Sequence, residues 1–103
     1  MSAPISIVIP TLNSACSLPA TLLSLMEGLD AGLICEVVVT DGGSNDATRV
    51  IAEAWGAEVI AGATSRGGQL RRGVAASRGE WVMVLHSDTI LQDGWTREVQ
   101  KRM

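Results

Sequence analysis

The chain has 103 residues, of which 47% are hydrophobic and 18% are charged, with two cysteines and a net charge of −3. This length suits one domain, and the hydrophobic fraction excludes a disordered chain. The acidic balance argues against nucleic acid as a partner. Apolar runs are too short to cross a bilayer, so we predict no transmembrane segment in these residues. The cysteine spacing fits neither a zinc site nor a disulfide framework, and we expect a cytoplasmic protein, with a peripheral membrane location left open for a longer form.

Short β-branched runs alternate with helical patterns along the chain. Strands are predicted over 5–9, 36–40, 58–61 and 81–85, and Pro10 is expected to end the first. Their nearly continuous apolar character is typical of strands buried on both faces. The alternating order predicts an α/β domain with a mainly parallel open sheet and right-handed crossovers.

Helices are predicted after each strand, and their first turns offer side chains that can accept hydrogen bonds from backbone amides. The expected N-caps are Ser17, either Ser44 or Asn45, and Asp93, while Gly56 is expected as a left-handed C-cap. The third helix is expected to end at Gly79. The residues expected to face the core are Leu18, Leu22, Leu25, Met26 and Leu29, then Ala47, Val50, Ile51 and Ala54, then Leu70, Val74 and Ser77, then Trp95, Val99 and Met103. Three arginines of the third helical region, Arg71, Arg72 and Arg78, are expected on its solvated face.

In an open parallel sheet, ligands bind beyond the carboxyl ends of the strands. That rule selects the segments 10–13, 41–43, 62–66 and 86–88. Together they hold two carboxylates and one imidazole, beside a cluster of arginines. Because phosphate oxygens repel carboxylates, this mixture suits a phosphate ligand held partly through Mg²⁺ or Mn²⁺, which accepts oxygen ligands from both.

Three motifs then resemble one known family in order and spacing. They are Val-Ile-Pro-Thr-Leu-Asn at 8–13, Val-Thr-Asp-Gly-Gly-Ser-Asn-Asp-Ala-Thr at 39–48 and Leu-His-Ser-Asp-Thr at 85–89, and they resemble the family 2 glycosyltransferases. Members of that family have the GT-A fold, use nucleotide-diphosphate sugars and invert the anomeric centre. The segment 66–73 also resembles a subgroup that carries Leu-His-Ala-Asp-Thr at the fourth strand.

The resemblance implies a set of donor-binding residues, which are Pro10, Thr11, Asn13, Asp41, Arg66, His86, Ser87 and Asp88. Pro10 and Thr11 would line the nucleoside pocket, and Asp41 would contact the uracil or ribose. Arg66 would lie near the base and the diphosphate. Asp88 stands at the last position of the family's Asp-x-Asp motif, which implies that it binds a divalent metal (Mn²⁺ or Mg²⁺) on the diphosphate.

Departures from the family pattern qualify these roles. Gly42 replaces the second acid of the frequent Asp-Asp-Gly-Ser motif, and Arg71 stands where the subgroup often has Asn. His86 replaces the first acid of Asp-x-Asp, so it can hydrogen-bond a ribose or ligate a metal but adds no negative charge. The family's general base and acceptor pocket are expected beyond Met103. We therefore predict one domain, residues 1–103, that is the first half of a longer enzyme.

Purely structural interpretations stay open for several of these residues. Asp41 and Asn45 could simply shape a turn and cap a helix, and Asp88 could be a turn residue. A histidine at a strand end, such as His86, is more often structural than a metal ligand.

Two functions remain for testing. The leading hypothesis is inverting transfer of a sugar, from a donor that is most simply a UDP-sugar, to an unknown acceptor hydroxyl. The alternative is a nucleotide-binding module without turnover. A phosphoacceptor receiver domain would need an acidic cluster at 10–13, which the chain lacks, and neither glycine pair forms a dinucleotide fingerprint. An unpaired sheet edge or the apolar side of the last helix would allow a homo-oligomer.

Overall fold

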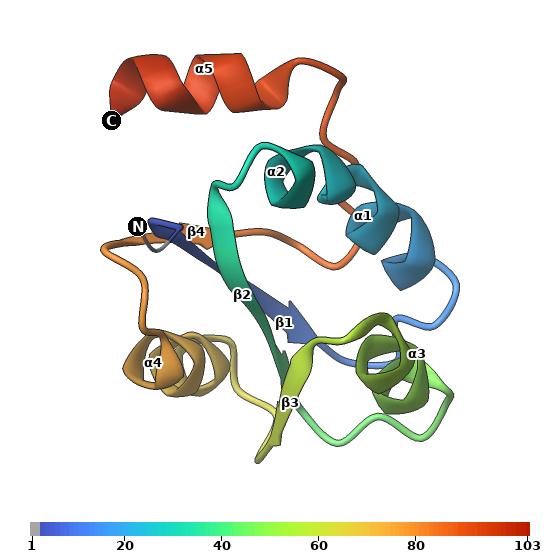
Figure 1. Cartoon of the computed structure of the whole chain (residues 1–103). Helices are drawn as coiled ribbons and strands as arrows, with labels where there is room; N and C mark the ends of the chain where they lie inside the picture. The colour runs from blue at the N-terminus through green and yellow to red at the C-terminus, as the bar shows by residue number, and fades with distance from the viewer. Residues whose placement is uncertain (1–2) are drawn as a thin grey trace.

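A computed structural model describes residues 3–103 as a parallel sheet between two layers of helices (Figure 1). In this part of the chain the sheet has four strands in the order β3-β2-β1-β4. The elements are β1 (Ile5–Thr11), α1 (Leu18–Ser24), α2 (Met26–Asp30), β2 (Ile34–Asp41), α3 (Thr48–Trp55), β3 (Glu58–Ala61), α4 (Arg66–Ala76), β4 (Trp81–Val84) and α5 (Trp95–Arg102). The predicted parallel α/β fold is confirmed.

The central strand β1 sets the register of the sheet. It pairs with β2 as far as the partners Thr11 and Asp41, and with β4 as far as Val8 and Val84. All pairings are parallel, so the strands end along one edge. The loops that follow β1, β2 and β4 therefore meet at that edge, as the strand-end rule requires.

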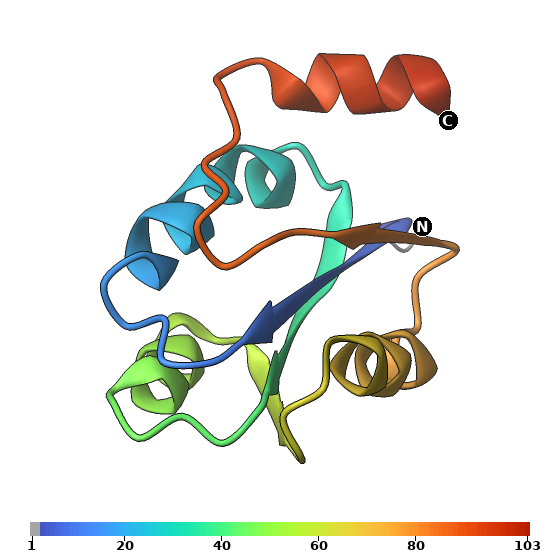
Figure 2. The same cartoon turned by 180° about the vertical axis from the view of Figure 1, so that it is seen from behind.

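The two faces of the sheet are covered differently. Helix α4 packs alone on one face against β1 and β2, while α1, α2 and α3 lie on the other, as the two opposite views show (Figures 1 and 2). Gly73 permits the close approach of α4, because a Cβ at this position would overlap the side chain of Val8. The main apolar core lies on the opposite face, where Ile5, Ile7 and Ile9 alternate inward.

Pro10 does not end β1, contrary to our prediction, and the strand continues to Thr11. The Val8 carbonyl accepts a hydrogen bond from Leu85 on the β4 side, whereas the Thr11 carbonyl accepts one from Gly42 on the β2 side. By this alternation, the Pro10 nitrogen faces the side that β4 has already left. The N–H that proline lacks would have had no β4 partner there, so the sheet loses no hydrogen bond.

The first predicted helix is two helices, and its expected cap is absent. Ser17 occupies the N-cap position of α1, but its side chain caps no amide and instead contacts the Ser14 carbonyl. Leu25 separates α1 from α2 and is fully buried. Because this break changes the direction of the chain, Met26 and Leu29 are exposed rather than inward.

Helix α3 begins later than predicted and turns a different face to the core. Its N-cap residue is Ala47, and Asp46 just before it accepts a hydrogen bond from the Thr48 amide at 3.0 Å, while Ser44 and Asn45 bond elsewhere. Thr48 and Ala52 are buried, and Ile51 packs partly against the core. The other residues predicted to face inward, Ala47, Val50 and Ala54, are exposed. Gly56 takes the expected left-handed C-cap conformation, with φ of 107°.

Helix α4 also rotates away from the predicted face and ends at Ala76, before Gly79. Its buried residues are Gln69 and Gly73, whereas Val74 is 49% exposed. A small residue is needed where the helix touches the sheet, and this requirement overrides the apolar periodicity. Arg72 is half-buried rather than solvated, and its Nη2 donates a hydrogen bond of 2.9 Å to the Ala63 carbonyl.

Asp93 does not cap α5; the cap residue is Gly94, with φ of 88°. The accepting carboxylate comes from Glu27 on α2, which bonds the amides of Gly94 at 2.8 Å and Thr96 at 3.0 Å. Trp95 is buried beside Gly28, as the predicted inward face required, but Met103 is 43% exposed.

The fourth strand is an edge strand of the described sheet and ends at Val84, one residue earlier than predicted. Its apolar side chains are partly open to solvent, with Trp81 48% and Val84 47% exposed. Among residues 3–103, no helix has the length and hydrophobicity needed to cross a membrane.

Candidate functional site

A cavity of about 470 Å³ opens at the carboxyl edge of the sheet. It is formed by the end of β1 and its following loop, the start of α4 and the loop after β4. The lining residues are Pro10, Thr11, Leu12, Asn13, Ser14, Ser17, Thr64, Arg66, Gln69, His86, Ser87 and Asp88. Every predicted donor-binding residue except Asp41 thus lines a single cavity.

Asp41 lies fully buried behind this cavity, at the end of β2. Its Oδ1 accepts hydrogen bonds from the Thr11 and Ser44 hydroxyls at 2.8 and 2.5 Å, and its Oδ2 accepts them from the Gly43 and Ser44 amides at 3.0 and 2.8 Å. Burial acts to raise the pKa of Asp41, but the hydrogen bonds from Ser44, Thr11 and Gly43 outweigh it, so the pKa lies below its usual value. Asp41 is therefore an ionised anchor of the β2–α3 turn, and its contact with a nucleoside remains a prediction.

Asn13 joins the loops that follow β1 and β2. Its amide donates to the Ser44 hydroxyl, and its Oδ1 accepts from the Asn45 amide, both at 2.8 Å. The φ of Asn13 is 50°, a left-handed conformation that asparagine tolerates better than most residues. These contacts give Asn13 a structural role at the rim of the cavity.

Gln69 sets the start of α4 against the ends of the two central strands. Its Nε2 donates to the carbonyls of Thr11 at 3.0 Å and Thr40 at 2.8 Å. A Cβ at Gly42 would lie 2.9 Å from Gln69 Oε1, which explains why the turn has glycine where the family often has an acid. Arg66, the first residue of the same helix, is exposed at the cavity. By holding the first turn of α4 against the strand ends, Gln69 thus fixes the position of Arg66.

The segment after β4 contributes His86 and Asp88 to the lining of the cavity. Ser87, between them, is bonded through its hydroxyl to Ser14 at 2.9 Å and through its carbonyl to the Thr21 hydroxyl at 2.9 Å. Asp88 is exposed, and the ion pairs formed within residues 3–103 do not include it. Its carboxylate is therefore available to a ligand.

The side chains of this cavity could hold a hard divalent cation only if a bound phosphate ligand supplied further oxygen atoms to it. Within the part of the chain that the structure describes, no group of three or more His, Cys, Asp and Glu side chains could enclose a metal ion. Mg²⁺ and Mn²⁺ sites at phosphates, however, commonly use one or two carboxylates and complete the shell with phosphate oxygens and water. Asp88 supplies the one carboxylate that such a site needs, and His86, two residues away, is another lining side chain that could bind a metal.

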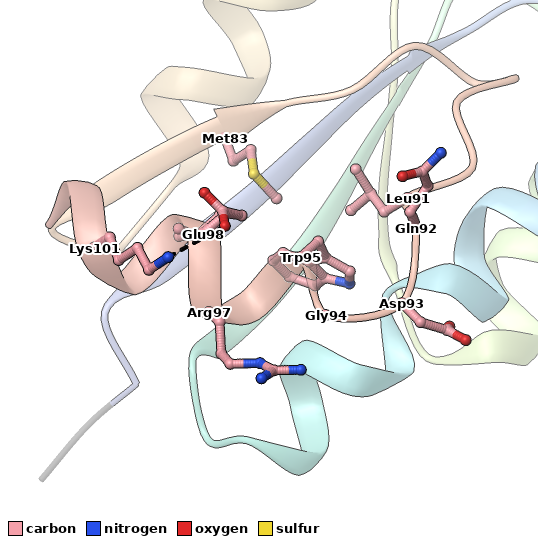
Figure 3. A pocket seen from close by; sticks show the side chains of 10 residues that line it. Met83, Leu91, Gln92, Asp93, Gly94, Trp95, Arg97, Glu98 and Lys101 are labelled. Carbon is pink, nitrogen blue, oxygen red and sulfur yellow. Dashed lines mark hydrogen bonds and ion pairs between the residues drawn. The ribbon is translucent and has the colours of Figure 1, made fainter.

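A second hollow of about 490 Å³ lies between β4 and α5 (Figure 3). Met83, Leu91 and Trp95 form its apolar side, while Glu98 and Lys101 make an exposed ion pair of 3.4 Å at its rim. None of the predicted donor-binding residues lines it. We assign it no role in donor binding.

Sequence reasoning missed the polar residues that support the cavity rather than follow a strand. Ser14, Ser17 and Gln69 line it, and Thr21 bonds to the lining residue Ser87. Ser14 follows directly on the first motif, which is a usable signal. Gln69 and Thr21 lie within helices, where nothing local distinguishes them from other polar residues.

A parallel α/β sheet with a polar cavity at its carboxyl edge defines the class of open α/β domains that bind ligands at that edge. The chain matches the family model described as Glycosyl transferase family 2 over residues 6–103. It therefore belongs to glycosyl transferase family 2, as the resemblance of its motifs predicted.

Curated relatives are identical to this chain at about a third of the aligned positions. Glucosyl-3-phosphoglycerate synthase of Mycobacterium tuberculosis is 34% identical over 95 residues, covering 84% of this chain and 29% of that protein. A PGL/p-HBAD biosynthesis glycosyltransferase of Mycobacterium bovis is 36% identical over 104 residues, covering 93% of this chain and 40% of that protein. The chain thus spans less than half the length of either relative.

Solved structures agree with the fold. The crystal structure of the M. tuberculosis glucosyl-3-phosphoglycerate synthase with UDP superposes with a TM-score of 0.75 at 33% identity, covering 85% of this chain and 35% of that chain. The same enzyme with Mn²⁺ and UDP-glucose also gives a TM-score of 0.75, covering 85% and 34%. The predicted GT-A fold is confirmed by this likeness.

Proposed function

We infer that this chain binds a nucleotide-diphosphate sugar, most simply a UDP-sugar, as the donor part of an inverting glycosyltransferase. The observation that carries this proposal is that Arg66 and Asp88 line the same cavity at the carboxyl edge of the sheet. A cation and a free carboxylate in one cavity suit a diphosphate that is contacted directly by Arg66 and through a metal by Asp88. The complexes of the related synthase with UDP and with UDP-glucose support the choice of nucleotide.

The nucleoside would lie at the end of β1, against Pro10 and Thr11. Asp41 supports this position from behind, since it holds the Thr11 hydroxyl at 2.8 Å. A direct contact from Asp41 to the uracil or ribose requires one of its oxygens to exchange a present partner for the ligand. Arg66 would lie between the base and the diphosphate.

Asp88 would hold a divalent metal, Mn²⁺ or Mg²⁺, on the diphosphate, and the related synthase has been crystallised with Mg²⁺ and UDP and with Mn²⁺ and UDP-glucose. When bound, such a metal offsets the negative charge that develops on the leaving nucleotide. His86, next to Ser87 at the rim, is placed to hydrogen-bond the ribose or to add a nitrogen ligand. Ser87 accepts a hydrogen bond from Ser14 at its hydroxyl oxygen and would still have its own hydroxyl proton to donate to the ligand.

The described residues offer no free general base at this edge. Asp41 is buried with both oxygens engaged, Asp88 is assigned to the metal, and His86 is assigned to the donor. Deprotonation of an acceptor hydroxyl would therefore use a group outside residues 3–103. For these 103 residues taken alone, the same observation favours the second candidate function, nucleotide binding without turnover.

The test is calorimetric titration of the chain with UDP, in Mn²⁺ and again in chelator. We expect tighter binding with Mn²⁺, and we expect Asp88→Asn to remove that difference while leaving binding in chelator unchanged. Equal affinity in the two conditions for the unsubstituted chain would remove the metal from the proposal. No measurable binding in either condition would overturn the donor site itself.

A further inference from the structure

The segment between β4 and α5 makes few hydrogen bonds to the rest of the protein, although Leu91 packs against the core. The last ladder bond of β4 joins the Leu85 amide to the Val8 carbonyl at 3.0 Å, and the next firm attachment is at Gly94, whose amide bonds Glu27. Between these two points, the hydrogen bonds to other parts of residues 3–103 both involve Ser87. The position of Asp88 therefore depends on how Ser87 is held.

Of these two bonds, the one from Thr21 acts on the backbone. The Thr21 hydroxyl lies 2.9 Å from the Ser87 carbonyl and 3.5 Å from the Ser17 carbonyl within its own helix. A hydroxyl has one proton, and the shorter contact is the one with hydrogen-bond geometry. The Ser87 carbonyl shares a rigid peptide plane with the Asp88 amide. Fixing that carbonyl therefore helps to fix the position of the Asp88 Cα, from which the side chain extends.

Thr21 has no other evident use for its hydroxyl. It is fully buried on α1 and does not line the donor cavity, so it cannot contact the ligand. Valine has nearly the same shape and would fill the same volume, yet it cannot donate to the Ser87 carbonyl. The hydroxyl can thus be removed with little change in packing.

We propose that Thr21 is a positioning residue for the metal site, acting through the Ser87 carbonyl to aim the Asp88 carboxylate into the cavity. This inference rests on the proposed function, because it assumes that Asp88 holds a metal on the nucleotide. It predicts a specific defect: Thr21→Val weakens the help that Mn²⁺ gives to UDP binding and leaves metal-free UDP binding intact.

The experiment measures UDP affinity by calorimetry in Mn²⁺ and in chelator for the 103-residue chain and its variants. The ratio of the two affinities is the Mn²⁺ enhancement. For Thr21→Val we expect this enhancement to fall about two- to tenfold, the range that one neutral hydrogen bond supports. Thr21→Ser keeps the hydroxyl and should retain the enhancement, although it loses a buried methyl group. If Thr21→Val does not fold, Thr21→Ala is measured in its place with the same expectation.

Thr40→Val is the matched control. Thr40 is also fully buried in the sheet, but its hydroxyl has no hydrogen-bond partner in residues 3–103. This variant should keep the full Mn²⁺ enhancement. If Thr21 only stabilised the fold, the Mn²⁺ enhancement would instead fall with the thermal stability of each variant. Thr21→Ser would then lose the enhancement together with Thr21→Val.

The possible failures are distinguishable. If the unsubstituted chain binds UDP equally with and without Mn²⁺, the proposed metal site fails and this inference falls with it. If Mn²⁺ helps the unsubstituted chain and Thr21→Val to the same extent, only the role of Thr21 is overturned.

Discussion

Thr11 and Asp41, register partners at the ends of β1 and β2, are joined by a hydrogen bond of 2.8 Å from the threonine hydroxyl to Oδ1 of the aspartate. The carboxylate is fully buried, and it gathers further donors from Gly43 and Ser44. The edge of the sheet that carries the candidate donor site is thus organised around a charge that the ligand need not touch.

Substitution of that charge should destabilise the whole domain. Asp41→Asn replaces one acceptor oxygen by an NH₂ group, which would face donors already aimed at it. We expect a loss of about 1–3 kcal/mol in the free energy of unfolding, as for other buried donors left without an acceptor. Urea unfolding measures this loss. A variant as stable as the parent would show that the network around Asp41 contributes nothing net.

Stability should also fall in acid. The pKa values of Asp41 and Glu36 lie below their usual ranges in the folded protein, because hydrogen bonds outweigh the effect of burial on each. A carboxyl whose pKa is lower when folded stabilises the protein above its unfolded value of about 4, and loses that contribution as the pH falls through the folded pKa. Urea midpoints measured from about pH 6 to about pH 3 should decrease, and less steeply for Asp41→Asn. An equally steep decrease in the variant would assign the effect to other carboxyls.

Gly28 should not tolerate a side chain. A Cβ there would lie 2.6 Å from Trp95 Cη2 and 2.7 Å from Ile34 Cδ1, so Gly28→Ala must displace the contact that docks α5. We expect a loss of about 1–3 kcal/mol, typical of overpacking, and a changed tryptophan emission spectrum.

The control for this prediction is Gly67→Ala, in the first turn of α4, where an added Cβ meets nothing within 4 Å. That variant should be neutral or slightly stabilised, since alanine favours a helix. Equal losses for the two alanines would mean that helix position, not contact with Trp95, limits stability.

Arg66 and Arg71 offer a matched pair on one helix. Both are exposed arginines of α4, but only Arg66 lines the donor cavity. Arg66→Ala should weaken UDP binding in Mn²⁺ and in chelator, by about tenfold for the loss of a charged hydrogen bond, and Arg71→Ala should leave both unchanged. Titrations at low and high salt add a check, because the Arg66 contribution should shrink with ionic strength. Comparable effects of the two substitutions would indicate a general attraction of the nucleotide to positive charge.

The 103 residues alone should not transfer sugar. A general base is worth about 10²–10⁴ in rate, and it must lie within hydrogen-bond reach of the acceptor hydroxyl. A donor-turnover assay with a UDP-sugar should give the same background rate for the chain and for Asp88→Asn. Transfer that depends on Asp88 would prove that the chain contains a base which we have not recognised.

Much of the site was predictable because it follows the strands. β-branched runs separated by helical patterns predict a parallel sheet, and parallel strands end at a common edge. The placement of Pro10, Arg66 and Asp88 around one cavity follows from that rule alone. The family motifs named the same segments independently.

Helix caps and helix faces were predicted poorly, because they depend on partners distant in the sequence. Asp93 is a good local cap, yet Glu27 takes its place from α2, 67 residues before Gly94. The apolar pattern of α4 favours Leu70 and Val74 as its inner face, but the close approach to Val8 requires Gly73 there.

The sequence by itself determined the order of the elements, the direction of the strands and the edge where the candidate ligand-binding residues gather, since these depend on short-range periodicity and on the chirality of crossovers. Only the tertiary structure decided that Asp41 is an internal anchor, that Gln69 ties α4 to two strands, and that Thr21 reaches Ser87 across 66 residues. Each of these contacts joins polar groups that are far apart in the chain. No local pattern encodes such a contact, because its free energy exists only once packing has removed water from both partners.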